Sequence, residues 1–152
     1  MELDAVRPDL LLALDLYEHA RHRDRGADAA KEWAGLHARY QALVNEASEP
    51  WGVDPGDVAD GLVLDVRRVA AYEQARTQVP GAVWHDPTFA ARWAGDVPHD
   101  RPVTVYCVYG HEVSRATVLR LRAVGVAARF LRGGIDGWSR MGLPVEAKGV
   151  LR

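Results

Sequence analysis

Cys107 is the only cysteine in the 152-residue chain, and it opens the stretch CVYGHEVS at residues 107–114. The apolar run PVTVYC at residues 102–107 predicts a buried strand that ends at this cysteine. HEVSRATVLRLRAVG at residues 111–125 predicts the helix that follows. Unpaired amide N–H groups at the start of a helix stabilise a nearby thiolate, and a thiolate is a nucleophile. The spacing therefore predicts a reactive cysteine.

Gly110 supports this interpretation, because glycine allows the positive φ that brings several backbone N–H groups toward one anion. The end of a parallel strand is also the edge at which open α/β sheets bind ligands. The alternative is that Cys107 is a buried structural residue, since free cysteine is among the most buried residue types.

The segments around this loop alternate between extended and helical patterns, which is typical of a parallel sheet with helices on both faces. Short apolar runs between turn residues predict strands at residues 61–66, 102–107 and 127–131. VPGAVW at residues 79–84 predicts a turn into a further extended segment. The predicted helices span residues 68–77, 86–95 and 111–125, and a short one surrounds Trp138. The predicted fold class is therefore α/β.

Residues 8–47 carry a different pattern, which predicts a helical hairpin before the α/β region. Pro8 and Asp9 suit a helix start, and RHRDRG at residues 21–26 suits its end and the following turn. A second helix is predicted from an apolar face at helical spacing, formed by Trp33, Leu36, Tyr40, Leu43 and Ala47. SEPWGVDPG at residues 48–56 marks a boundary. We therefore divide the chain into a helical extension, residues 1–50, and an α/β domain, residues 51–152.

The apolar face of the second helix has two interpretations. It can cover the α/β domain, where burial of apolar area stabilises the fold, and this is the simpler expectation. It can instead bind a protein partner or a second copy of the chain.

Composition and charge exclude several classes of function. A net charge of −2 and the absence of a basic stripe argue against nucleic acid and anionic membranes as partners. A single cysteine excludes an internal disulfide, a cysteine-rich zinc cluster and an internal dithiol redox couple. The first residues lack the basic leader of a signal peptide, and no stretch approaches the length of a membrane span. We expect a cytoplasmic protein.

Four stretches in a fixed order resemble the rhodanese (sulfurtransferase) domain family. They read GLVLDVR, VPGA, VYCVYGHEVSRA and FLRGGIDGWSRMGLPVE, and the resemblance as a whole spans roughly residues 53–147. The resemblance implies a rhodanese-like sulfurtransferase domain in residues 51–152, built on a rhodanese-like parallel sheet. It also implies an enzyme in which a cysteine takes a sulfane sulfur from a small-molecule donor such as thiosulfate. The cysteine holds this sulfur as a persulfide and passes it to cyanide or a thiol.

The resemblance assigns roles to particular residues of this chain. Cys107 is the persulfide nucleophile, and Asp65 and Arg67 match the family's Asp-x-Arg after a strand. Arg67 then either meets the substrate or forms an ion pair that stiffens the loop from below. No metal or organic cofactor is implied, because the carried group is the sulfur itself. The loop that binds the substrate consists of Val108, Tyr109, Gly110, His111, Glu112 and Val113.

Some residues depart from the family's pattern. The family's His before its Ile-Pro-Gly-Ala is Gln78 here, and Glu112 lies in a loop where many rhodanese domains carry basic residues. A carboxylate that points inward disfavours the thiosulfate dianion, whereas one at the helix start complements the helix dipole. His111 either offsets the negative charge when protonated or lies on the surface of the following helix.

Two other classes of function remain as alternatives. A cysteine phosphatase or arsenate reductase uses Cys-x5-Arg to clamp an oxyanion, but the sixth position after Cys107 is Val113. A rhodanese-like module that binds or regulates without turnover usually lacks the cysteine. The presence of Cys107 and the identity of Val113 therefore favour the sulfurtransferase.

Overall fold

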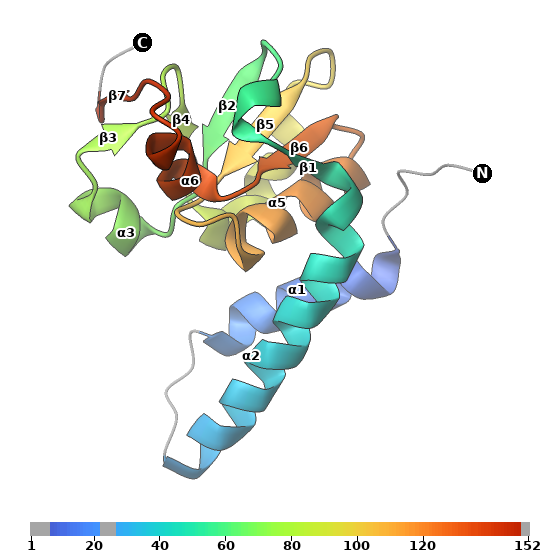
Figure 1. Cartoon of the computed structure of the whole chain (residues 1–152). Coiled ribbons are helices and arrows are strands. Elements are labelled where there is room, and N and C mark those ends of the chain that lie inside the picture. Colours follow the sequence, from blue (N-terminus) through green and yellow to red (C-terminus); the bar gives the residue numbers. More distant parts are fainter. Residues whose placement is uncertain (1–6, 22–26, 150–152) are drawn as a thin grey trace.

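A five-stranded parallel sheet forms the centre of the protein in the computed structural model, which describes residues 7–21 and 27–149 (Figure 1). The strand order is β1-β6-β5-β2-β4, so β5 lies in the middle. Every residue of β5 is buried, as expected for a strand that is covered on both faces. The strands are β1 (Gly52–Val53), β2 (Leu62–Asp65), β4 (Val83–Trp84), β5 (Val103–Tyr106) and β6 (Ala128–Leu131). The strands predicted from the three apolar runs are confirmed as β2, β5 and β6.

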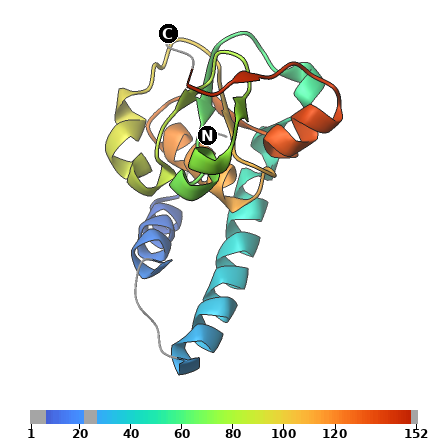
Figure 2. The same ribbon diagram turned by 90° about the vertical axis from the view of Figure 1, so that its left-hand side faces the viewer.

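Helix α5 (Glu112–Ala123) covers one face of the sheet together with α4 (Ala90–Trp93) (Figure 2). Val118 and Leu121 of α5 are fully buried and belong to one apolar cluster with Phe130 of β6. Burying one such side chain stabilises the folded state by about 1.5–3 kcal/mol. This cluster is the main core of the α/β region.

Helix α6 (Gly134–Arg140) lies on the opposite face, and the short helix α3 (Val69–Gln74) follows β2. Ile135 of α6 packs in a second cluster with Tyr106 and Leu131. Successive residues of a strand point to opposite faces, so β6 contributes to the α5 cluster through one residue and to the α6 cluster through the next. The prediction of helices on both faces is confirmed.

The helix predicted at residues 86–95 is broken into three short turns: η3 (Pro87–Phe89), α4 and η4 (Ala94–Asp96). The entry agrees with the prediction, because the carboxylate of Asp86 accepts a hydrogen bond from the N–H of Thr88. The carbonyl of Asp86, however, accepts from the N–H of Phe89 and the indole N–H of Trp93. The bond from Phe89 joins residues three apart instead of the four of an α-helix, so the first turn is the tighter 3₁₀ turn η3.

Several short elements have no counterpart in the sequence patterns. β3 (Thr77–Gln78) and β7 (Glu146–Ala147) form a separate antiparallel pair. The segment at residues 48–56, predicted as a boundary, contains η1 (Glu49–Trp51), the edge strand β1 and η2 (Pro55–Asp57). Strands of two residues are too short to show an alternating pattern, so only the structure reveals them.

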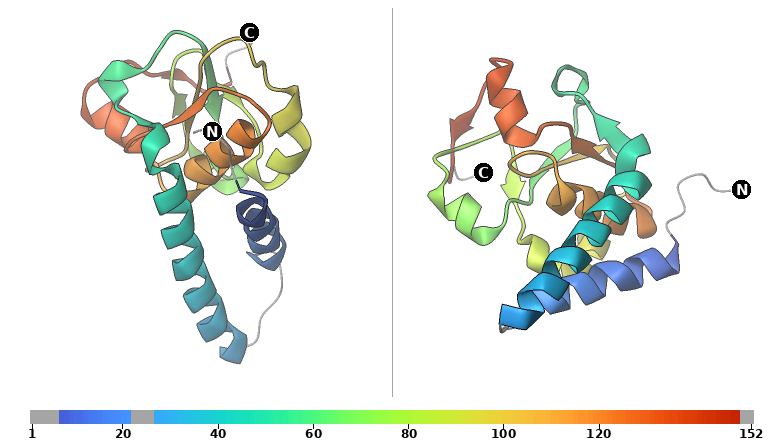
Figure 3. Two further views of the ribbon diagram at one scale, coloured as in Figure 1. Left: turned by 90° about the vertical axis from the view of Figure 1, so that its right-hand side faces the viewer. Right: turned by 60° about the horizontal axis from the view of Figure 1, so that its bottom comes forward.

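The N-terminal helices α1 (Pro8–Arg21) and α2 (Ala27–Ser48) pack against the outer side of α5, and α2 extends well beyond the sheet (Figures 2 and 3). The buried contact is formed by Leu10, Leu14, Tyr17, Tyr40, Val44 and Leu119. The cover expected from the second helix is therefore present, although Leu36 and Leu43 remain 39% and 38% exposed. The predicted turn at residues 22–26 lies outside the described residues. Within the described ranges, no helix combines the length and apolar character needed to cross a membrane.

Candidate active site

The loop that begins with Cys107 connects β5 to α5, so the predicted strand–loop–helix arrangement is present. Gly110 lies in the middle of this loop with φ of 75°, the left-handed conformation that glycine adopts readily. The first backbone bond of the helix runs from the N–H of Arg115 to the carbonyl of His111. The chain before Arg115 is therefore curled but not yet helical in its hydrogen bonding.

The backbone N–H groups of residues 108–113 are available as donors. Among the residues that the structure describes, no backbone carbonyl accepts a hydrogen bond from any of them. Consecutive free amides in a loop that contains a left-handed glycine are typical of an anion-binding concavity. The loop residues named from the sequence thus supply a set of unpaired donors next to the cysteine.

The sulfur of Cys107 has a polar neighbour that sequence reasoning missed. Its Sγ donates to the hydroxyl Oγ of Ser114 at 3.1 Å, and Ser114 is itself fully buried in the first turn of α5. Cys107 is only 5% exposed. When the thiol is ionised, the Ser114 hydroxyl is in place to donate to the thiolate. Cys107 is therefore buried against a hydrogen-bonding group.

Gly110 and the Gly133–Gly134 turn before α6 touch backbone to backbone. A Cβ on Gly110 would lie 2.8 Å from the nitrogen of Gly133, and a Cβ on Gly134 would lie 2.5 Å from the carbonyl oxygen of Cys107. Real Cβ atoms do not approach other atoms so closely, because the interior is already packed to crystal-like density. Both positions therefore require glycine.

The first turn of α6 also holds the loop through hydrogen bonds. The N–H groups of Ile135 and Asp136 donate to the carbonyls of Cys107 and Val108, each at 3.0 Å. These bonds occupy the carbonyl side of the first two loop peptides. In a planar trans peptide the N–H points opposite to the C=O, so the N–H groups that follow these carbonyls face away from α6.

The side chains of the loop differ in their exposure. Tyr109 is 57% exposed, and its ring lies 5.8 Å from that of His111, which is also exposed. Glu112 instead lines a small cavity with Arg68 and Arg120, on the side of the N-terminal helices. The electrostatics agree with this position, since burial raises the pKa of Tyr17 in α1 and the charge of Glu112 raises it further.

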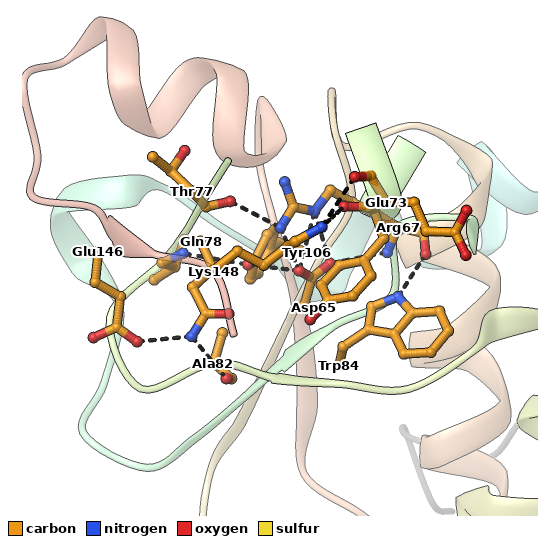
Figure 4. Close-up of polar contacts among 12 residues, drawn as sticks. Asp65, Arg67, Glu73, Thr77, Gln78, Ala82, Trp84, Tyr106, Glu146 and Lys148 are labelled. Carbon is orange, nitrogen blue, oxygen red and sulfur yellow. Dashed lines mark hydrogen bonds and ion pairs between the residues drawn. The ribbon is translucent and has the colours of Figure 1, made fainter. Parts of the chain in front are cut away.

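Arg67 forms a buried ion pair with Asp65, the last residue of β2 (Figure 4). Its guanidinium donates to both carboxylate oxygens, with the shortest distance 2.6 Å from Nη2 to Oδ2, and also to the carbonyl of Thr77 at 3.0 Å. The hydroxyl of Tyr106 donates to the same carboxylate at 3.0 Å. Burial acts to lower the pKa of Arg67, but the hydrogen bonds and charge of Asp65 outweigh burial and raise that pKa. These contacts match the structural role considered for Arg67.

Gln78, which stands where the family has a histidine, joins the C-terminal strand to the Val-Pro-Gly-Ala turn (Figure 4). Its Nε2 donates to the carboxylate of Glu146 at 2.7 Å and to the carbonyl of Ala82 at 3.3 Å. Glu146 also accepts from the N–H of Gly81. The ammonium of Lys148 donates to the carbonyls of Tyr72 and Glu73, which ties the end of β7 to α3.

The fold and the cysteine loop define a rhodanese-type domain, and comparison with known proteins supports this. The family model described as "Rhodanese-like domain" matches residues 52–141. The chain therefore belongs to the rhodanese-like family. A curated relative named "Sulfurtransferase", from Allochromatium vinosum, is 32% identical over 106 residues, which cover 69% of this chain and 97% of that protein.

Solved structures agree on the fold. A rhodanese-related protein from Thermoplasma volcanium matches with a TM-score of 0.55 and 22% identity, over 62% of this chain and 96% of that one. A thiosulfate sulfurtransferase from Pseudomonas aeruginosa matches with a TM-score of 0.53 and 25% identity, over 62% of this chain but only 19% of its own. A protein from Rhodopseudomonas palustris described as a possible tyrosine phosphatase has a TM-score of 0.58 and 19% identity, over 69% of this chain and 92% of that one. At such low sequence identity these matches support a common architecture only, and the chemistry must be argued from the site itself.

Proposed function

We propose that this protein is a sulfurtransferase that carries a sulfane sulfur as a persulfide on Cys107. The observation that supports this most directly is the row of unpaired N–H groups in residues 108–113, next to the cysteine. A persulfide is a large anion, and oriented amide donors stabilise an anion without the presence of a cation. The loop and the carried sulfur together account for the site without a metal or an organic cofactor.

The transfer has two steps. The thiolate of Cys107 attacks the outer sulfur of thiosulfate; the new S–S bond forms as the old one breaks, and sulfite leaves with the electron pair. The acceptor, cyanide or a thiolate, then attacks the outer sulfur of the persulfide and releases the Cys107 thiolate. Ser114, 3.1 Å from the sulfur, donates to that thiolate at both ends of the cycle.

The charges around the loop bear on the choice of donor. The guanidinium of Arg67 is paired with Asp65, and that of Arg115 with Glu49. Glu112 lies toward the N-terminal helices rather than free at the loop. The charged side chains around the loop therefore neither repel nor strongly attract a dianion, and thiosulfate and 3-mercaptopyruvate are both suitable donors to test.

Mass spectrometry of the intact protein tests the proposal directly. After incubation with thiosulfate, and separately with 3-mercaptopyruvate, we expect the mass to increase by one sulfur atom, and cyanide to remove this sulfur as thiocyanate. Cys107→Ser is the matched control because it leaves the chain without any thiol. A protein that gains no sulfur from either donor is a rhodanese-like binding module instead. A gain that persists in Cys107→Ser would place the sulfur elsewhere and refute the mechanism.

A further inference from the structure

Arg115 connects the cysteine loop to the end of helix α2. Its Nε donates to the carbonyl of Gly110 at 3.1 Å. Its Nη1 donates to the carbonyl of Asn45 at 3.3 Å, the hydroxyl of Ser48 at 3.2 Å and the carboxylate of Glu49 at 3.0 Å. One guanidinium thus spans two segments that are far apart in the sequence.

The contact with Gly110 controls the orientation of one loop peptide. The peptide between Gly110 and His111 is planar and trans, as are all peptides in the described structure, so its C=O and N–H point in opposite directions. Holding the carbonyl of Gly110 toward Arg115 therefore turns the N–H of His111 away from the guanidinium. That N–H belongs to the row of unpaired donors in residues 108–113.

The guanidinium itself is held firmly. Its carbon lies 4.2 Å from the centre of the Phe130 ring, and the side chain is only 15% exposed. Glu49 also pairs with Arg132, whose Nη1 lies 2.7 Å from the second carboxylate oxygen. Hydrogen bonds from Arg132 and Arg115 lower the pKa of Glu49, so its negative charge persists into acid. The carbonyl end of α2 adds a further negative potential for the cation.

We propose that Arg115 is a positioning residue for the loop of residues 108–113. The end of α2, which holds Arg115, therefore contributes to the active site. This inference rests on the proposed function, because it assigns the loop amides to the sulfur. Asn45, Ser48 and Glu49 lie before residue 52, where the match to the family model begins. The N-terminal extension thus contributes the anchor for a residue inside the rhodanese-like domain.

The test compares Arg115→Met with Arg132→Met. Both changes remove an arginine that pairs with Glu49 and lies over Phe130, but only Arg115 contacts the loop. We expect kcat/KM for sulfur transfer to fall about tenfold in Arg115→Met, because a loop donor is misplaced. Arg132→Met removes a partly exposed ion pair but leaves the bonds of Arg115 to Gly110 and to the end of α2, so we expect kcat/KM to stay within about twofold of the unmodified protein.

A second readout distinguishes positioning from general destabilisation. Cys107 is the only thiol, so its alkylation rate by iodoacetamide can be followed against pH without interference. Loss of one oriented donor is expected to move the midpoint of this profile upward by about half a pH unit in Arg115→Met and to leave it unchanged in Arg132→Met. If both variants give the same midpoint and the same kcat/KM, the proposal is overturned.

Arg115→Lys keeps the test decisive if Arg115→Met fails to fold. Lysine retains the charge near Glu49, but a single ammonium does not reproduce the fork that reaches Gly110 and α2 together. We expect the same upward shift of the alkylation midpoint, and an unshifted midpoint refutes the positioning role. If the unmodified protein transfers no sulfur at all, the proposed function fails, while the alkylation profiles still decide the role of Arg115.

Discussion

Replacing Gly110 by alanine is expected to destabilise the protein more than the same replacement at Gly142. Both glycines have φ of 75°, so each alanine carries the same penalty for left-handed backbone, about 1–2 kcal/mol. At Gly142 the added Cβ meets nothing within 4 Å. At Gly110 it would lie 2.8 Å from the nitrogen of Gly133 and 2.9 Å from the oxygen of Leu131, and backbone atoms cannot rotate aside as a flexible side chain does.

The additional cost at Gly110 is overpacking against the Gly133–Gly134 turn, about 1–3 kcal/mol. The free energy of unfolding should therefore fall by about 2–5 kcal/mol in Gly110→Ala and by about 1–2 kcal/mol in Gly142→Ala. In a protein of this size each kcal/mol lowers Tm by about 2–4 °C. We expect the Tm of Gly110→Ala to lie at least about 2 °C below that of Gly142→Ala.

Thermal unfolding followed by circular dichroism measures this difference, and urea unfolding checks it as a free energy. The two variants share the backbone penalty, so the difference between them isolates the contact between the cysteine loop and the turn before α6. Equal Tm values for the two variants would show that the loop is free to move away from that turn. The close packing described for Gly110 would then be wrong.

Two further changes test buried polar groups of the α/β domain. Asp65→Asn leaves the buried Arg67 without a counter-charge and is expected to lower the free energy of unfolding by about 3 kcal/mol in a urea titration. The exposed Asp57→Asn serves as its control, and equal losses in the two variants contradict the buried ion pair. Ser114→Ala removes the hydroxyl 3.1 Å from the sulfur and is expected to slow persulfide formation about fivefold. An unchanged rate in time-resolved mass spectrometry would exclude a role for this hydroxyl.

The sequence alone predicts the sheet where its strands are long enough to show a pattern. β2, β5 and β6 each have four residues, and apolar runs between turn residues reveal them. β1, β3, β4 and β7 have two residues each; only β4 was anticipated, as an extended segment after the Val-Pro-Gly-Ala turn. The hydrogen bonds of β1, β3 and β7 are made to segments distant in the sequence, so no local pattern marks these three strands.

The same distinction applies to the site. Cys107 and Gly110 are evident from residue type and spacing, because strand end, glycine and helix start are neighbours in the sequence. Ser114 and the contact of Arg115 with α2 depend on where side chains point between packed elements, which residue type does not specify. Glu112 illustrates this limit, since only the structure shows that it lines the same small cavity as Arg68 and Arg120.

In the loop around Cys107, the backbone packs against its neighbours while two of the side chains are exposed to solvent. Gly110 and Gly134 meet main chain to main chain, whereas Tyr109 and His111 project outward and are exposed. Natural variation can therefore exchange the outward residues, and so alter which compounds approach the sulfur, while the peptide frame stays intact. A lineage that adopts a new sulfur donor is expected to diverge at positions 109 and 111 and to retain both glycines.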